Sequence, residues 1–322
     1  MTTLTELAFP AMGTSVRLLA APGAPLEDAR ALIEDLEARL TRFDPQSELC
    51  ALNADPRETV PASGPLRDAV RAAIAGAAAT DGLADPTLLG AVVRAGYDRS
   101  LAGRARADLR EALAAAPEPR PAAPSPTAAW RRVRIDDAAG TIARPPGLRL
   151  DLGGSAKGLA ADLATRLLAA HGPCAADLGG DLRVRGVHEV LVPNPLTGTL
   201  ADVVALDDDA VATSGIDRRI WWDAANRPAH HLLDPATGRP AWTGVVSATA
   251  KAPTAALAEA LAKAAILAGP AAGRRVLSRF GGLLVTTQGV VLTAGAALGV
   301  GAAARRGTRT VPESAAGMVA GT

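Results

Sequence analysis

The sequence predicts an α+β protein in which mixed β-sheets are flanked by helices. An amphipathic helical pattern lies near the N-terminus, and short apolar runs bounded by glycine, aspartate and proline fill the middle of the chain. Strands and helices follow one another without a regular βαβ alternation, which favours α+β over a doubly wound α/β fold. With 322 residues, the chain is long enough for one large domain or two medium ones, with ample chain to bury a core.

The first half of the chain is expected to hold a broken strand, two helices and a surface excursion. Residues 6–20 alternate loosely between apolar and polar positions and predict a strand that is interrupted by a turn beginning at Met12. An apolar stripe at helical spacing predicts a helix over 26–43, and a second helix is expected over about 66–79. Residues 102–128 are rich in Ala, Pro and Arg and predict a surface excursion with at most a short helix.

The second half is expected to be richer in strands. Strands are predicted at 130–135, 141–143, 148–152, 283–287 and 289–293, and helices at about 156–170, 254–267 and 271–279. Short apolar runs predict a β-meander at 174–178, 182–187, 189–192 and 202–212. A single domain is expected over 1–306, followed by a disordered tail at 307–322 that is small, polar and proline-containing.

Composition and charge argue against several function classes. The net charge is +1 and no long basic run occurs, so no nucleic-acid partner is expected. No apolar stretch is long enough to span a bilayer, and the N-terminus has no basic start, apolar segment or lipobox cysteine, so a cytoplasmic protein is expected. Cys50 and Cys174 lack the paired spacing of a zinc or redox motif and are expected to be free apolar residues.

The first segment that could carry chemistry is DLGGSAKG, residues 151–158, where a strand is expected to end and a helix to begin. Its glycines allow a ligand to approach the backbone, the helix N-terminus attracts anions, and Lys157 adds a positive charge for a phosphate. The spacing is not that of a Walker A loop. A glycine turn with a surface lysine remains the alternative.

The second segment is HHLLDPATGRP, residues 230–240. Its Asp-Pro and Thr-Gly pairs mark a tight turn, and a histidine before such a turn could accept a proton from a hydroxyl nucleophile. Spacing alone favours the alternative of a turn-capping aspartate beside two surface histidines.

Three weaker segments are the loop carrying Asp85, the Ser-Gly turn before Arg218, and the helix carrying Glu259 and Lys263. The last two residues lie four apart, which is the spacing of an ordinary surface ion pair. Zinc is not expected, because the chain has only four histidines and no clustered thiols.

Taken together and in order, these segments resemble one family. The series PAMGTSVRL, FDPQSELCALN, TDGLADPTLLG, DLGGSAKGLAAD, DLGGDLRVRG, ATSGIDRR, HHLLDPATGRP and the Ala-rich helix at about 254–267 is similar to the FAD:protein FMN transferases, the ApbE-like proteins, from about residue 7 to residue 295. The resemblance implies a T-fold-like α+β architecture with a flavin dinucleotide in a cleft. It also implies transfer of FMN from FAD to a Thr or Ser hydroxyl of a target protein, with release of AMP. Some members instead hydrolyse FAD.

The resemblance also assigns residues. It implies FAD contacts at Met12, Leu83, Ala84, Asp85, Asp151 and Lys157, and it makes His231 the candidate base. In the family, Mg²⁺ is held by a backbone carbonyl, here that of Gly154, and by an Asp and a Thr four apart on the late helix. Those two positions are Glu259 and Lys263 in this chain.

This departure puts the expected Mg²⁺ in question. A carboxylate can bind a hard cation, but an ammonium group cannot. Lys263 could sit where the metal would and neutralise the pyrophosphate itself, or it could pair with Glu259 and leave a weaker metal site. The segment around Leu83 also lacks the aromatic residue that usually follows its glycine. Two other functions stay open: an FAD-binding protein without transferase activity, and an FAD pyrophosphatase that forms FMN and AMP.

Overall fold

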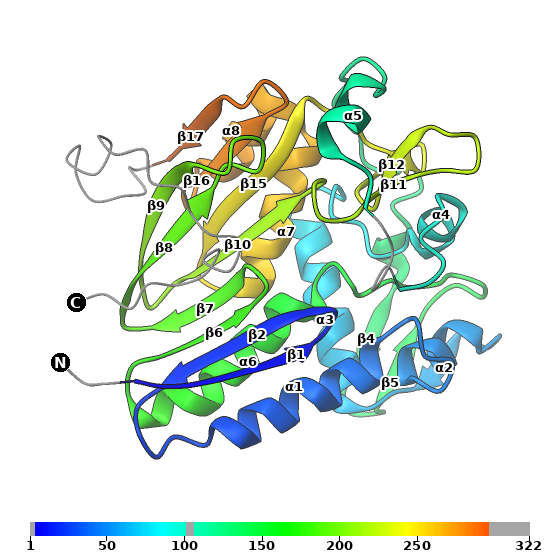
Figure 1. The fold of residues 1–322 in the computed structure, drawn as a ribbon. Helices are drawn as coiled ribbons and strands as arrows, with labels where there is room; N and C mark the ends of the chain where they lie inside the picture. The colour runs from blue at the N-terminus through cyan, green and yellow to red at the C-terminus, as the bar shows by residue number, and fades with distance from the viewer. Residues whose placement is uncertain (1–3, 101–105, 296–322) are drawn as a thin grey trace.

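A computed structural model describes residues 4–100 and 106–295 of the chain (Figure 1). Its centre is an eight-stranded sheet in which every neighbouring pair of strands is antiparallel. The strand order across the sheet is β1 (Thr5–Ala11), β2 (Thr14–Ala20), β6 (Cys174–Leu178), β7 (Asp181–Arg185), β10 (Ala210–Gly215), β15 (Val245–Ala252), β16 (Gly282–Thr286) and β17 (Val291–Ala294). The α+β prediction is confirmed.

Helices cover one face of this sheet. Helix α7 (Ala255–Leu267) runs behind β10 and β15 in Figure 1 and is buried on nearly all sides, as expected for a helix that is apolar all round. The neighbouring helices are α1 (Leu26–Leu40), α3 (Gly64–Ala79), α6 (Ala156–Leu168) and α8 (Gly269–Leu277). The predicted helix positions are confirmed to within a few residues at each end.

The opposite face of the sheet is covered by a separate hairpin of β8 (Val187–Pro193) and β9 (Leu200–Asp207). Along the central strands, successive side chains point to opposite faces of the sheet. In β10, Ala210 and Ala212 pack against the helices, whereas Val211 packs with residues of the hairpin.

Smaller elements complete the fold. They are α2 (Glu48–Ala54), α4 (Leu89–Arg94), α5 (Leu109–Ala114), the 3₁₀ helices η1 (Ala129–Arg132) and η2 (Ala169–His171), and the short strands β3 (Thr59–Pro61), β4 (Arg134–Asp136), β5 (Thr141–Ala143), β11 (Ile220–Trp222), β12 (Pro228–His230), β13 (Leu233–Asp234) and β14 (Arg239–Pro240). Of the predicted excursion, α5 and the proline-rich chain after it are described. Ala122 N–H donates to the carbonyl of Leu267 at 2.8 Å, which ties this segment to the body of the fold.

Three strand predictions need correction. The run 202–212 is two strands, because the chain turns at Asp208, whose φ is 54°, and the β8–β9 hairpin leaves the main sheet, so no simple meander forms. The predicted strand 148–152 is irregular: Leu150 N–H donates to Asn53 Oδ1 at 2.7 Å and Asp151 N–H donates to the carbonyl of Pro86 at 2.8 Å. The predicted strand 130–135 begins instead as the 3₁₀ helix η1.

The predicted break of the first strand is a tight turn. Met12 and Gly13 have φ angles of 52° and 69° and join β1 to β2, as in a two-residue hairpin with both central residues left-handed. No helix within the described ranges is long and apolar enough to cross a membrane. The domain limits 1–306 and the cytoplasmic location stay predictions, and the predicted tail 307–322 lies outside the described residues.

Candidate active site

One large cavity, about 1570 Å³ in volume, opens where the helix α6 N-terminus, the β1–β2 turn and the loops around β11–β13 meet. It is larger than the usual pocket for a small molecule, so it has room for a dinucleotide. The ten residues singled out from the sequence all line it: Met12, Leu83, Ala84, Asp85, Asp151, Gly154, Lys157, His231, Glu259 and Lys263. The fold therefore brings them together, while their individual roles stay predictions.

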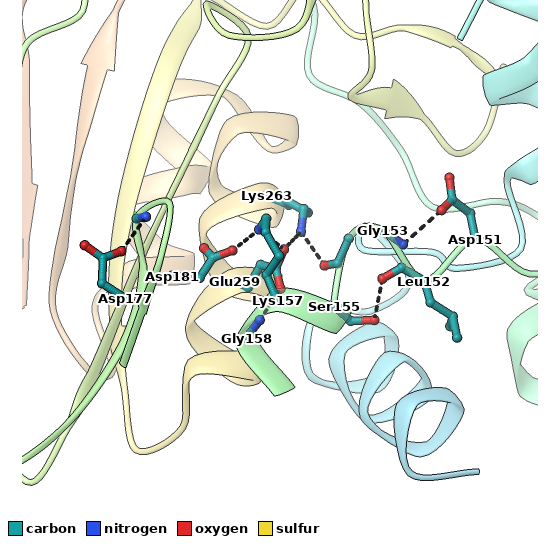
Figure 2. Close-up of polar contacts among 12 residues, drawn as sticks. Asp151, Leu152, Gly153, Ser155, Lys157, Gly158, Asp177, Asp181, Glu259 and Lys263 are labelled. Carbon is teal, nitrogen blue, oxygen red and sulfur yellow. Dashed lines mark hydrogen bonds and ion pairs between the residues drawn. The ribbon is translucent and has the colours of Figure 1, made fainter. Parts of the chain in front are cut away.

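The loop before α6 is held in place by its own backbone and by Asp151. Gly153 N–H donates to Asp151 Oδ1 at 2.9 Å, and Ala156 N–H donates to the carbonyl of Leu152 at 2.9 Å. In the first turn of α6, Gly158 N–H donates to Glu259 Oε2 at 3.1 Å, so a carboxylate of this chain already lies at the helix N-terminus (Figure 2). The sequence predicted that an anion would lie at this helix N-terminus, but not that the anion would be the carboxylate of Glu259.

Gly158 permits this contact because α6 and α7 cross closely there. A Cβ at Gly158 would lie 2.6 Å from the carbonyl oxygen of Ala255, closer than real Cβ atoms approach backbone. The absence of a side chain thus lets the first turn of α6 lie against α7 and reach Glu259.

Four charged side chains meet between α6, α7 and β7, and we call them the charge cluster: Lys157, Asp181, Glu259 and Lys263 (Figure 2). Glu259 Oε1 accepts from Lys157 Nζ at 2.9 Å and from Lys263 Nζ at 2.8 Å. Lys157 Nζ also donates to Asp181 Oδ2, and Lys263 Nζ also donates to the carbonyl oxygen of Gly154. The Asp181 and Glu259 side chains are only 2% and 1% exposed.

This geometry corrects two expectations from the sequence. Glu259 and Lys263 do not form a surface ion pair, because both belong to a buried cluster. Lys157 is not a surface lysine, because its ammonium group lies between two carboxylates. Asp181, the second of those carboxylates, was not singled out from the sequence, although it stands in the family-like block DLGGDLRVRG.

The pKa values of the cluster follow from burial and from the neighbouring charges. Burial alone would raise the pKa of Glu259, but the charges of Lys157 and Lys263 outweigh it and hold that pKa well below its usual range. Burial would lower the pKa of Lys157, but Asp181 and Glu259 raise it. Burial, followed by the charge of Glu259, raises the pKa of Asp181 to about 6. Burial lowers the pKa of Lys263, and the charge of Glu259 opposes that shift. With both lysines protonated and both carboxylates ionised, the cluster holds two positive and two negative charges.

The residues at the expected metal position do not fit a divalent cation. The carbonyl of Gly154 and the carboxylate of Glu259 are the two oxygen donors expected there, and the ammonium group of Lys263 is hydrogen-bonded to both. A dication bound by these oxygens would displace or repel that ammonium group. Within the described part of the chain, no group of three or more His, Cys, Asp or Glu residues is placed to hold a metal ion.

The two adjacent histidines differ in their burial and in their position relative to the cavity. His230 is 0% exposed; its Nδ1 accepts from Leu232 N–H at 3.3 Å and its ring meets the Trp242 ring edge-on at 4.7 Å. His231 lines the cavity, and its buried Nδ1 has no hydrogen-bond partner among the described residues. Burial, and then the charge of Arg219, lower the pKa of His231 well below its usual value. His231 is therefore the neutral histidine that faces the cavity, and the alternative of two surface histidines is wrong for His230.

Asp85, which lines the cavity, also has one unpartnered oxygen. Its Oδ1 accepts from Thr87 N–H at 2.8 Å and from Thr87 Oγ1 at 2.6 Å, whereas its buried Oδ2 has no partner among the described residues. Burial raises the pKa of Asp85. A ligand N–H group would satisfy the open oxygen.

Sequence reasoning missed an aromatic and basic wall of the cavity. Four of the chain's eight aromatic residues line it: Phe43, Tyr97, Trp221 and Trp222. The Tyr97 ring lies 5.6 Å from the Phe43 ring and 5.8 Å from the Trp221 ring, and the Arg42 guanidinium lies 4.2 Å from the Phe43 ring centre. Such a wall suits a planar ring. The four aromatic positions follow no regular spacing in the sequence, so no pattern marks them as one wall. The one available signal was that aromatic residues are scarce, at 2% of the chain.

The cavity is also more basic than the chain as a whole. Among the described residues, nine lysines and arginines line it against six carboxylates, whereas the whole chain has a net charge of +1. Arg218 and Arg219, which follow the Ser-Gly turn noted in the sequence, are among the nine. This excess of positive charge favours an anionic ligand.

Comparisons with known proteins identify the family to which the chain is similar. The model of the ApbE family matches residues 12–286. The chain is 35% identical over 155 residues to the FAD:protein FMN transferase of Treponema pallidum, and 30% identical over 146 residues to that of Escherichia coli K12. These matches cover 42% of the chain in both cases, and only 42% and 41% of the two relatives.

Solved structures extend the likeness over most of the chain. The crystal structure of the ApbE protein of Thermotoga maritima has a TM-score of 0.72 at 27% identity and covers 91% of this chain and 97% of that one. The flavin transferase ApbE of Vibrio cholerae has a TM-score of 0.70 at 22% identity, covers 91% of this chain and 97% of its own, and supports the fold alone. Because the family model spans most of its length, the chain belongs to the ApbE family.

Proposed function

We propose that this chain transfers FMN from FAD to a Thr or Ser hydroxyl of a target protein and releases AMP. The observation that carries the proposal is a large basic cavity that His231, Asp85 and the loop before α6 all line. The names of the curated relatives from Treponema pallidum and Escherichia coli give it direct support.

The chemistry assigned to the chain is an in-line displacement at phosphorus. The hydroxyl oxygen of the target attacks the phosphorus on the FMN side of FAD, the bond from that phosphorus to the bridging oxygen breaks, and AMP leaves with that oxygen. His231 accepts the hydroxyl proton, because its imidazole is neutral and lines the cavity. Lys263 and the arginines of the cavity offset the charge of the pyrophosphate.

The low pKa of His231 has a consequence for its role. A base whose pKa lies far below 7 is present in the right form at neutral pH but holds a proton weakly. The negative charge of a bound pyrophosphate would raise the pKa of His231 towards neutrality, because it opposes the charge of Arg219. Binding of FAD thus prepares the base for proton transfer.

The second candidate is an FAD-binding protein without transferase activity, and the observation that favours it is Lys263. An ammonium group carries one charge and cannot act as a Lewis acid, so the leaving phosphate receives less stabilisation than a dication would give. FAD hydrolysis to FMN and AMP is the third outcome, in which water takes the place of the target hydroxyl.

One experiment separates the three. The purified chain is incubated with FAD alone and with an extract of Escherichia coli from which its own FAD:protein FMN transferase has been removed. Covalent flavin fluorescence on a protein band together with AMP indicates transfer. Free FMN and AMP without extract indicate hydrolysis, and unchanged bound FAD in both samples would refute the proposed activity.

The matched histidine variants locate the activity. His231→Ala should lower the transfer rate by about 10²- to 10⁴-fold, the usual effect of removing a general base, while FAD stays bound. His171→Ala is the control, because His171 is exposed at the end of η2 and does not line the cavity. Equal rates for the two variants would remove His231 from the mechanism.

A further inference from the structure

Lys263 occupies a position shaped for a cation. Its ammonium group donates to the carbonyl oxygen of Gly154 and, at 2.8 Å, to Glu259 Oε1 (Figure 2). A carbonyl and a carboxylate oxygen are the donors that hard metal cations prefer. The side chain is 13% exposed and lines the cavity, so the cation is buried on one side and open to a ligand on the other.

The ammonium group has capacity left for a ligand. It carries three N–H donors, and two are directed at Gly154 and Glu259. Within residues 4–100 and 106–295 no acceptor is placed for the third, so it is available to an anionic oxygen in the cavity. Lys263 can therefore bind the protein on one side and a phosphate on the other, which is the arrangement that a bridging metal ion provides.

The charge balance of the cluster leaves no place for an additional dication. Lys157 and Lys263 already neutralise Asp181 and Glu259, and both ammonium groups share one oxygen of Glu259. Adding two positive charges beside them would oppose two buried ammonium groups without a new carboxylate to compensate. The cluster is complete without a metal ion.

We propose that Lys263 is a built-in cation that takes the place of a divalent metal ion beside the pyrophosphate of FAD, so that this chain binds FAD without a divalent metal. The proposal rests on the proposed function, because FAD as the ligand comes from there. It predicts a site that differs from the metal-dependent arrangement implied by the family resemblance.

The test measures FAD affinity, by quenching of flavin fluorescence, in metal-free buffer with EDTA and again with Mg²⁺. The wild-type dissociation constant should change by less than about threefold between the two buffers. Lys263→Met removes the ammonium group without adding a metal ligand, so affinity should fall by roughly 10- to 100-fold in both buffers. Lys263→Thr supplies a hydroxyl oxygen instead, so its loss should be reversed by Mg²⁺.

Lys251→Met is the matched control. Lys251 lies on β15, pairs with Asp209 at 2.8 Å and does not line the cavity, so its replacement should leave FAD affinity unchanged in both buffers. The wild-type comparison decides the proposal even if a Lys263 variant fails to fold. A wild-type protein that binds FAD only when Mg²⁺ is present would overturn it.

Manganese binding gives a second readout that does not depend on FAD. Electron paramagnetic resonance of Mn²⁺ should show no ion bound by the wild-type protein and a bound ion in Lys263→Thr. A bound Mn²⁺ in the wild type that Lys263→Met leaves in place would contradict the proposal. If FAD fails to bind in every buffer, the proposed function itself falls, which is a different result from binding that requires Mg²⁺.

Discussion

Replacing Glu259 by Gln tests the charge cluster, because it removes one charge while keeping the shape of the side chain. Three donors converge on Glu259: Lys157 Nζ at 2.9 Å, Lys263 Nζ at 2.8 Å and Gly158 N–H at 3.1 Å. The amide of Gln retains one acceptor, but its NH₂ group cannot accept a bond from an ammonium group or from Gly158 N–H. Two buried ammonium groups then face a single carboxylate, Asp181.

The expected cost is about 3–5 kcal/mol of unfolding free energy, the range for removing one partner of a buried ion pair. Chemical denaturation by urea at pH 7, followed by circular dichroism, measures it. Glu34→Gln is the matched control, because Glu34 pairs with Arg30 at 2.8 Å but is 48% exposed, and its loss should cost less than about 1 kcal/mol.

A double variant shows whether charge balance is the cause. Glu259→Gln combined with Lys263→Met restores equal numbers of positive and negative charges, so it should be more stable than Glu259→Gln alone by at least about 1 kcal/mol. Additive losses in the double variant, or a cost below about 1 kcal/mol for Glu259→Gln, would refute the view that the four charges stabilise one another.

Three further results are expected. Burial lowers the pKa of His230 to about 3, so at acid pH this side chain binds a proton in the unfolded chain but not in the folded one. Between pH 7 and pH 5, urea titrations should therefore show the wild type losing about 2 kcal/mol more stability than His230→Asn, which keeps the contribution of His231. Gly158→Ala places a methyl group against the backbone of Ala255 and should cost about 1–3 kcal/mol in the same assay, and a neutral result would disprove the close crossing of α6 and α7. Trp221→Ala removes a ring from the aromatic wall and should weaken FAD binding by about 1 kcal/mol in fluorescence titrations. Unchanged affinity would show that neither the flavin nor the adenine ring stacks on this wall.

Local signals in the sequence predicted much of the fold. The β1–β2 turn follows from Met12 and Gly13, and α1 and α3 follow from apolar stripes that need no information from the rest of the chain. The irregular segment at 148–152 could not be foreseen, because its backbone groups are satisfied by Asn53 and Pro86, which are distant in sequence. Periodicity carries no information about such partners.

In the site, too, local signals predicted some features, and contacts between distant residues determined the others. Its loops were predicted because turn residues and the family-like blocks mark them, and the ten residues chosen from those blocks all line the cavity. The charge cluster could not be predicted without the fold, because Lys157 is separated from Glu259 by 102 residues and from Asp181 by 24. Glu259 and Lys263 looked like a surface pair only because helical spacing does not reveal which face of a helix is buried among other helices.

The most direct test of the proposed flavin transfer is the mass of the labelled target protein, measured together with the AMP released. Transfer by attack on the FMN-side phosphorus predicts a protein heavier by one FMN less one water, with the flavin on a Thr or Ser residue and one AMP released per flavin attached. A target that carries no flavin, or AMP released without any covalent flavin, would contradict it.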